Sequence, residues 1–422
     1  MMESYFKALQ EKYDISAELL QLMQECYQES QKSWGRINEI TSYNQLKVLN
    51  AFQKNQAGDF HLNGSTGYGY GDVGRDLFEK IWADVFKAER ALVRASILSG
   101  THAIAIALLG VLEPGDEFVS ISGMPYDTLQ KVIGHDKEPG TVAAMGAKHI
   151  VVDLKDDDFD YPAIAQAVHK GTKMVCIQRS RGYSWRKSLT IEKIARAAKF
   201  VKEIDENIII FVDNCYGEFV ELKEPLEAGC DLIAGSLIKN PGGALAPRGG
   251  YVAGREDLVE LASIRLSAPG IAGEVGSALD FNRLAYQGLF MAPLIVEQAL
   301  KGAVYASCLL EKMGYDVSPR YDEERADIIQ AIKLGSADKI RAYCRGIQKA
   351  SPLDAYVTPY DTPLPGYEDP IIMAGGTFIQ GSSIELSVDA PIREPYIAYM
   401  QGGISLSQVI AGVAAAAGEM EK

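Results

Sequence analysis

The sequence predicts an α/β protein with a mainly parallel sheet covered by helices on both faces. Between about residues 76 and 255, short runs of β-branched apolar residues alternate with amphipathic stretches of helical periodicity. Because parallel strands are joined by crossover helices, this alternation is typical of a three-layer arrangement. Candidate strands lie at 117–122, 149–154, 174–178, 208–213 and 231–236, and the helical stretches between them include 102–112, 161–170 and 190–204.

The segments on either side of this region have a different character. Residues 4–31 carry apolar side chains at helical spacing, which predicts an N-terminal helical arm. The stretch 57–74 is rich in glycine and breaks every regular pattern, so we expect an ordered loop there. After a helical region from about 256, the remainder mixes strand and helix patterns. The predicted parts are a helical arm at 1–60, a large α/β domain at 61–313 and a smaller C-terminal α+β domain at 314–422.

Composition and charge argue against several classes of protein. The 422 residues carry a formal net charge of −14, which disfavours binding to nucleic acid. The first residues are charged and amphipathic, unlike a signal peptide, and no uninterrupted apolar run approaches the roughly 18 residues of a membrane span. The six cysteines are scattered, so we expect neither a disulfide framework nor a metal site. These features predict a cytoplasmic protein that binds neither nucleic acid nor a membrane.

Polar residues follow the predicted strands where a ligand site is expected. The strand at 208–213 ends in Asp213, and the strand at 231–236 ends in Ser236, three residues before Lys239. Ligands of parallel sheets bind beyond the carboxyl ends of the strands. Each residue alone is a weak signal, since a strand-terminal Asp is often only a turn former.

Together with residues 99–101, these side chains suit an aldehyde cofactor that carries a phosphate and a pyridine nitrogen. Ser99, Gly100 and Thr101 open an apolar helix, whose unpartnered amides would face the phosphate. Asp213 would keep the ring nitrogen protonated, and Lys239 would form the Schiff base. For that role we expect desolvation or the cofactor's charge to lower the pKa of the Lys239 amine.

At this point the chain resembles the fold type I pyridoxal-phosphate enzymes, in particular the cystathionine and methionine γ-lyase family. The resemblance is closest to the branch labelled methionine γ-lyase family or aluminium-resistance protein, and it covers nearly the whole chain. It implies the three-layer fold of these transferases. The motifs that carry it are GYGYGDVGRDLFEKIWADVF, ILSGTHAIAIAL, ISGMPYDTL, FVDNCYGEFVE, SLIKNPGGALAPRGGYVAGR and SSIELSVDAPIREPYIAYMQGG.

The resemblance implies pyridoxal 5′-phosphate as cofactor and assigns roles around it. Lys239 would be the Schiff-base lysine, and Asp213 would pair with the pyridinium. Gly100 and Thr101 would offer backbone amides to the phosphate, with the hydroxyl of Ser236 assisting.

Aromatic and basic residues complete the implied site. Tyr126 looks like the tyrosine that stacks on the cofactor ring and protonates a leaving sulfur, the alternative being a core or turn tyrosine. His102 either lies over the ring or caps the helix start. In the relatives a Tyr and an Arg reach the phosphate of the neighbouring subunit's cofactor. Tyr68, Tyr70 and Arg75 are the candidates here, with plain loop packing equally open for one tyrosine, and a homodimer or homotetramer with shared sites is implied.

Two departures from the family pattern concern the substrate. The family places an arginine before Leu-Ser near the C-terminus to clamp the substrate carboxylate, whereas this chain has Glu385. Arg393 is the candidate replacement, and a structural surface arginine is the alternative. Arg179 and Arg181 follow a strand where many relatives have Asn-Pro, and either of them could contact the cofactor or a substrate acid.

The leading functional hypothesis is a carbon-sulfur lyase that performs β- or γ-elimination on a sulfur amino acid of the cystathionine or methionine type. A second hypothesis keeps the cofactor but changes the reaction to transamination or aldol cleavage, because the same fold serves all of these. A remote third hypothesis is a nucleotide-binding or regulatory protein, prompted by GYGYGDVG. A dinucleotide fingerprint should follow a strand, and no strand is predicted immediately before this loop.

Overall fold

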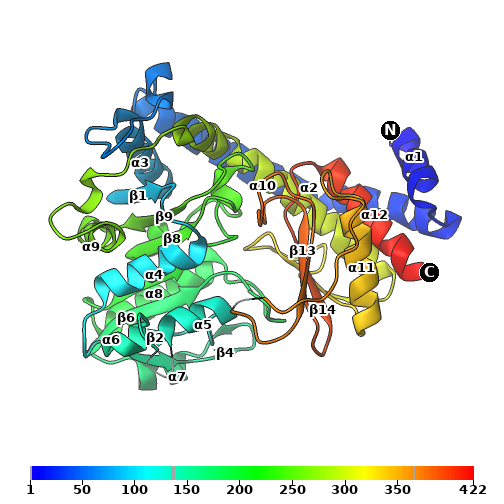
Figure 1. Cartoon of the computed structure of the whole chain (residues 1–422). Helices are drawn as coiled ribbons and strands as arrows, with labels where there is room; N and C mark the ends of the chain where they lie inside the picture. Colours follow the sequence, from blue (N-terminus) through cyan, green and yellow to red (C-terminus); the bar gives the residue numbers. More distant parts are fainter. Residues whose placement is uncertain (1, 135–137, 365) are drawn as a thin grey trace.

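A mainly parallel sheet forms the centre of the larger part of the molecule (Figure 1). The computed structural model describes residues 2–134, 138–364 and 366–422. Among these residues, seven strands pair in the order β1-β9-β8-β7-β6-β2-β3, and only β9 runs antiparallel to its neighbours. The strands are β1 (Arg90–Arg94), β2 (Glu117–Ser120), β3 (Lys148–Val151), β6 (Thr172–Gln178), β7 (Ile209–Asp213), β8 (Leu232–Ser236) and β9 (Gly250–Gly254).

All five predicted strands of this sheet are therefore confirmed. The sequence did not predict β1 and β9, because β1 is bounded by arginines and β9 by glycines, so that neither shows a long β-branched run. A short hairpin of β4 (Leu154–Lys155) and β5 (Asp158–Phe159) follows β3.

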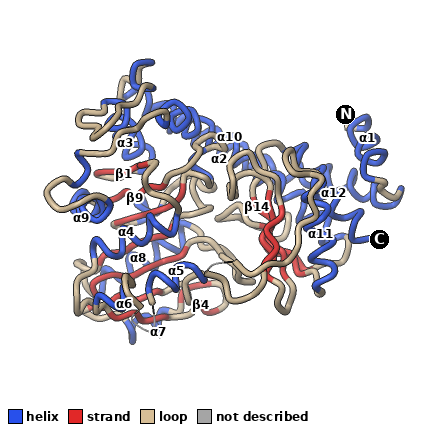
Figure 2. Tube along the Cα trace, viewed as in Figure 1, coloured by secondary structure: helices blue, strands red, loops and turns tan. Residues whose placement is uncertain are grey.

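Helices cover both faces of the sheet, which confirms the three-layer α/β prediction (Figure 2). The core residues of α4 and α9 pack with those from one face of the strands, and those of α3 and α8 pack with the other face. On the first face lie α4 (Gly100–Val111), α5 (Asp127–Ile133), α6 (Val142–Met145) and α9 (Glu256–Leu266), and on the second lie α3 (Val73–Phe86), α7 (Tyr161–Ala167) and α8 (Ile191–Ile204).

Two long helices connect the two parts of the molecule. The arm consists of α1 (Glu3–Tyr13) and α2 (Ala17–Lys54), so it extends beyond the predicted 4–31, and α2 packs along α10 (Phe281–Lys312). By length and composition α10 is apolar enough to cross a membrane. However, 61% of its most apolar window is buried inside the protein, as in a core helix. Counting uninterrupted apolar runs did not single this helix out, because polar residues interrupt it.

A smaller antiparallel sheet lies at the other end of α10. Five strands in the described part of the C-terminal region pair in the order β10-β11-β14-β13-β12, and α11 (Ala337–Lys349) and α12 (Leu406–Glu421) cover one face. The N-terminal segment lies along α12: the Tyr5 hydroxyl donates to the Ser407 carbonyl at the start of this helix, and the Ser16 hydroxyl donates to Glu421 (3.1 Å) at its end. The strands are β10 (Asp316–Ser318), β11 (Gln330–Lys333), β12 (Ile371–Ala374), β13 (Ser387–Pro391) and β14 (Ile397–Gln401).

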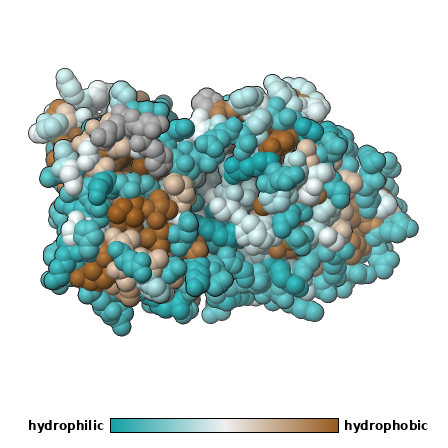
Figure 3. Space-filling model, turned by 90° about the horizontal axis from the view of Figure 1, so that it is seen from below, coloured by the Kyte–Doolittle hydropathy of each residue, from teal (hydrophilic) through white to brown (hydrophobic). Residues whose placement is uncertain are grey.

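The domain boundaries at 60/61 and 313/314 stay predictions, because α10 contributes to the hydrophobic cores of both parts. On the face seen from below, hydrophilic side chains cover most of the surface, and apolar side chains gather in separate patches (Figure 3).

The glycine-rich loop is ordered by one buried carboxylate, that of Asp72. This residue caps α3 by accepting from the Arg75 amide (2.9 Å), and its other oxygen accepts from the Ser65 hydroxyl (2.6 Å) and the Ala278 amide (2.9 Å). Although burial opposes it, these hydrogen bonds lower the pKa of Asp72 to about 2. The loop contains a short 3₁₀ turn, Asp59–Leu62, and it follows the helix α2 and not a strand, which is unlike a dinucleotide-binding loop.

We expect Asp72→Ala to lower the free energy of unfolding by about 2 kcal/mol, since it removes a helix cap and three further hydrogen bonds to a charged group. Urea denaturation followed by circular dichroism measures this. In the wild type the contribution is fully present above about pH 4 and is lost as the pH falls towards 2. Asp59→Ala, in the same loop with a side chain 90% exposed, is the matched control. Equal stability of the two variants would contradict the prediction.

Candidate active site

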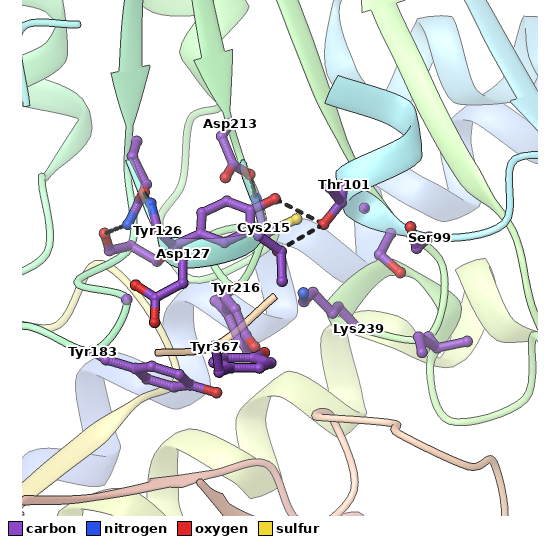
Figure 4. A pocket seen from close by; sticks show the side chains of 17 residues that line it. Ser99, Thr101, Tyr126, Asp127, Tyr183, Asp213, Cys215, Tyr216, Lys239 and Tyr367 are labelled. Atoms are coloured by element: carbon purple, nitrogen blue, oxygen red, sulfur yellow. Dashed lines mark hydrogen bonds between the residues drawn. The ribbon is translucent and has the colours of Figure 1, made fainter. Parts of the chain in front are cut away.

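A cavity of about 190 Å³ opens at the carboxyl ends of β6, β7 and β8 (Figure 4). Its position is the one expected for ligand sites in parallel sheets. The structure brings the predicted central residues together there, in contact with residues that the sequence did not single out. The lining residues are Ser99, Gly100, Thr101, Tyr126, Asp127, Thr128, Gln178, Ser180, Gly182, Tyr183, Asp213, Cys215, Tyr216, Ser236, Ile238, Lys239 and Tyr367.

Lys239 lies in the turn after β8, and its side chain reaches into the cavity. Its Nζ lies 4.4 Å from the centre of the Tyr216 ring. Burial acts to lower the pKa of Lys239, but Tyr216, Cys215, Tyr126 and Asp213 favour the charged amine and raise the pKa well above its ordinary value. The expectation that desolvation lowers this pKa is therefore wrong, whereas the alternative, that the charge of the cofactor lowers it, stays a prediction. A lower pKa would require a further positive charge beside the amine.

Asp213 ends β7, directly beside β8 in the sheet. Its Oδ1 accepts a hydrogen bond from the Cys215 amide (3.1 Å). Burial raises the pKa of this carboxyl, although the charge of Lys239 opposes the rise. A buried carboxylate at this depth is suited to hold a proton on a heterocyclic nitrogen, because the resulting ion pair offsets the cost of its burial.

The N-terminus of α4 forms a cradle at another side of the cavity. Ser99 caps the helix, which begins at Gly100, so the amides of Gly100 and Thr101 have no partner within the helix. A Cβ atom at Gly100 would lie only 3.2 Å from the Cys215 Sγ. The cradle thus offers backbone donors and the positive end of a helix, in space that a side chain would fill.

Tyr126 lies over the middle of the cavity, between Asp213 and the start of α4 (Figure 4). Its hydroxyl is 3.1 Å from the Thr101 Oγ1, and its amide donates to the Gln178 Oε1 (3.1 Å). Burial, reinforced by the negative charge of Asp213, raises the pKa of Tyr126 well above 10. The phenol therefore keeps its proton at neutral pH and is suited to donate it.

Comparison with known proteins identifies this arrangement. The profile of the family described as Methionine gamma-lyase matches residues 19–421. The chain belongs to the methionine gamma-lyase family. The cofactor of this family is pyridoxal 5′-phosphate, and the fold is that of the fold type I pyridoxal-phosphate enzymes.

Three relatives illustrate the similarity. The uncharacterized protein YnbB of Bacillus subtilis (strain 168) is 52% identical over 377 residues, which span 89% of this chain and 90% of YnbB. A structure from Clostridium acetobutylicum, assigned provisionally as a cystathionine beta-lyase involved in aluminium resistance, is 47% identical, covers 99% of both chains and has a TM-score of 0.96. A carbon-sulfur lyase involved in aluminium resistance from Clostridium novyi NT is 46% identical, covers 99% of both chains and has a TM-score of 0.94.

The residues present fit the family's cofactor. The α4 cradle suits its phosphate, Asp213 suits its ring nitrogen and Lys239 suits its aldehyde, all within one buried cavity. Ser236 also lines the cavity, near the cradle: its Cβ would lie 3.4 Å from a Cβ at Gly100.

Several predicted residues lie outside this cavity. The His102 Nδ1 accepts from the Leu98 amide (3.0 Å), which corresponds to the capping alternative. The Arg393 guanidinium donates to Asp369 (3.0 Å) in a half-exposed pair, and it does not line the cavity. This arrangement corresponds to the surface alternative for Arg393.

The other residues at which the chain departs from the family pattern form hydrogen bonds within the protein. Glu385 is buried and accepts from the amides of Phe378 (2.8 Å) and Ile379 (2.9 Å), so it holds a loop of the small sheet. Arg179 is buried and donates to Asn214 (2.8 Å) and Glu221 (2.7 Å) beneath the turn after β7.

Arg181 is also buried away from the cavity lining. Its amide donates to Asp327 (3.2 Å) and its guanidinium to the Ser318 hydroxyl (3.3 Å), so it connects the large sheet to the C-terminal region. Neither Arg179 nor Arg181 lines the cavity. Within this chain, therefore, no contact supports the expectation that one of them binds the cofactor or an acidic group of the substrate.

The residues expected to reach a neighbouring subunit lie on and under the glycine-rich loop. Tyr68 is 76% exposed and Tyr70 is 66% exposed, with their ring centres 5.8 Å apart. Arg75 is buried and donates to the carbonyls of Gly69 (2.8 Å) and Gly276 (3.0 Å). Within this chain Arg75 therefore supports the loop, while the two exposed tyrosines remain candidates for contact with a second subunit.

We expect Gly100→Ala to weaken the binding of pyridoxal 5′-phosphate by about tenfold, because the added methyl group enters the cradle. Titration of the cofactor-free protein, followed by absorbance, measures this affinity. Gly35→Ala in α2 is the matched control, since nothing lies within 4 Å of a Cβ there. An unchanged affinity in Gly100→Ala would show that the phosphate binds elsewhere.

Proposed function

We propose that this protein is a carbon-sulfur lyase that catalyses β- or γ-elimination on a sulfur-containing amino acid. The observation that supports this proposal is the joint placement of Lys239, Asp213 and the N-terminus of α4 around one buried cavity. The name of the Clostridium novyi relative, a carbon-sulfur lyase, is in line with it.

Lys239 and Asp213 would handle the two protons on which the reaction depends. When bound, the cofactor withdraws electrons from the α-carbon of an amino acid. The Lys239 amine is the basic group that can remove the α-proton and carry it to a neighbouring atom, since it lies inside the cavity. Asp213 would hold the proton on the ring nitrogen, and its burial, together with the partial burial of Lys239, limits the access of water that would compete for these protons.

Tyr126 would act as the acid in the bond-breaking step. As the carbon-sulfur bond breaks, its electron pair stays with the sulfur, which takes the phenolic proton and leaves as a thiol. Water then releases ammonia and a 2-oxo acid from the remaining carbon skeleton. The raised pKa of Tyr126 favours the donor role over that of a base.

Transamination and aldol cleavage remain the alternative reactions on the same cofactor, because the Lys239 and Asp213 pair serves all three. The released product distinguishes the three reactions, since only elimination yields a thiol.

We also propose a cytoplasmic homodimer or homotetramer with shared active sites. The exposed side chains of Tyr68 and Tyr70 support the sharing of active sites between subunits.

We expect the wild type to release a 2-oxo acid together with a thiol, or with hydrogen sulfide in the case of cysteine and homocysteine, from at least one of cystathionine, methionine, homocysteine and cysteine. Lys239→Ala should reduce kcat at least 1,000-fold, as roughly expected for loss of a catalytic base. Coupled assays for thiol and 2-oxo acid measure both products. The same variant should lose the absorbance band of the lysine-linked cofactor. Lys199→Ala, a control on α8 with a side chain 79% exposed, should retain both properties. An unchanged absorbance band in Lys239→Ala would overturn the assignment of the lysine.

We expect Tyr126→Phe to lower kcat by roughly 100-fold with a smaller change in KM, because the ring is retained while the proton donor is lost. Steady-state kinetics with the best substrate of the screen measure this. The deficit should shrink for substrates whose thiol has a low pKa, since such a leaving group needs less help from an acid. A deficit independent of the leaving group would contradict the acid role.

A further inference from the structure

The outer wall of the cavity is aromatic. Tyr183, Tyr216 and Tyr367 all line it, and the ring centres of Tyr183 and Tyr367 are 6.0 Å apart. Aromatic faces attract cations, and this wall already does so, since the Lys239 ammonium lies 4.4 Å from the Tyr216 ring centre.

A carboxylate lies directly behind this wall. Asp389 is on β13, where its neighbours Val388 and Ala390 face the core under α11 and α12, so Asp389 points to the opposite face of the small sheet. Its Oδ2 accepts both from the Tyr183 hydroxyl (3.0 Å) and from the side-chain Nε2 of Gln401 (3.0 Å). Its Oδ1 has no hydrogen-bond partner within the described ranges.

Two further observations place Asp389 within reach of a ligand. Asp389 is not itself among the residues that line the cavity, but its side chain is only partly buried, and its hydrogen-bond partner Tyr183 does line the cavity. The charge of Lys239 also opposes the rise in the pKa of Asp389 that burial causes. Ser387 lies two residues earlier on the same face of β13, and its buried Oγ also lacks a partner in the part of the chain that the structure describes. An ammonium group has three donors, and these two free oxygens are acceptors.

The charges that line the cavity favour a cation over an anion at this wall. Among the described lining residues, Lys239 is the single cationic side chain, whereas Asp127 and Asp213 are acidic. Figure 4 shows the Asp127 carboxylate on the same side as Tyr183 and Tyr367. A second carboxylate on a substrate would therefore meet negative charge here, and a second ammonium would be attracted.

We propose that Asp389 is the specificity-determining residue of this site, and that it binds a distal ammonium group of the substrate. The preferred substrates are then amino acids whose sulfur carries an aminoalkyl group. Tyr183, Tyr216 and Tyr367 surround the ammonium, and Ser387 supplies a second acceptor. This inference rests on the proposed function, because it assumes that an amino acid occupies the cavity.

The test measures binding rather than turnover. The holoenzyme is titrated by calorimetry with L-lysine, L-norleucine and L-2-aminoadipate, which have similar side chains with a cationic, neutral and anionic end. None of them has a carbon-sulfur bond, so the comparison holds even if the lyase activity is absent. We expect L-lysine to bind about tenfold more tightly than L-norleucine, as for a hydrogen bond between charged groups, and L-2-aminoadipate to bind most weakly.

Asp389→Asn should bring the lysine-to-norleucine ratio close to one. An asparagine can keep its oxygen towards Tyr183 and Gln401 and place its amide at the free position, so only the charge and one acceptor change. Ser387→Ala, a milder second variant, should reduce the ratio about threefold. Asp338→Asn, a control on α11 with a side chain 95% exposed, should leave it unchanged.

The outcomes separate the two proposals. A wild-type ratio near one, or a ratio that survives both Asp389→Asn and Ser387→Ala, would overturn the assignment of Asp389. Selective lysine binding without release of thiol from any sulfur amino acid would instead count against the proposed lyase reaction and leave the specificity intact.

Discussion

The site depends on the cost of burying the Lys239 ammonium. A buried charge without partners is strongly unfavourable, and here the carboxylate of Asp213 and the ring of Tyr216 offset that cost. Asp213 is the last residue of β7 and Tyr216 lies in the turn after it, and β7 is the direct neighbour of β8 in the sheet. The parallel pairing of two strands thus places a cation and an anion at the same edge. The start of α4 adds the amides that an anionic ligand requires.

Much of this arrangement could be predicted from local pattern. The ends of β7 and β8 and the start of α4 follow from short apolar runs and a helix cap, so Asp213, Lys239 and Gly100 were predicted and lie around one cavity. Tyr367 and Asp389 could not be found this way, because they come from the C-terminal region and reach the site only through tertiary packing. The raised pKa of Lys239 was missed for the same reason, since it depends on groups that are distant in the sequence.

The structure shows which partners bind the residues that depart from the family pattern. Glu385 stands where relatives carry an arginine, and it is used to hold two backbone amides of a loop. Arg179 is neutralised by glutamates beneath the sheet, and Arg393 pairs with an aspartate at the surface. Positive charge is therefore kept away from the cavity by pairing elsewhere. The resemblance to the family could not reveal this, because it compares residue types and not their partners.

When the charged groups around the cavity are matched with those of the cofactor, one carboxylate, that of Asp389, has no partner of opposite charge. A bound pyridoxal 5′-phosphate brings an anionic phosphate, which the amides of α4 can match, and a protonated ring nitrogen, which Asp213 can match. Asp389 has no counterpart on the cofactor, and its free oxygen has none among the described residues of this chain. The Asp389 carboxylate is partly buried and accepts hydrogen bonds from Tyr183 and Gln401, but no cationic side chain among the described residues forms an ion pair with it, and burying a carboxylate without a counter-charge carries a cost in stability. Such a cost is typical of positions that recognise a ligand, so the substrate is the component from which the missing positive charge is expected.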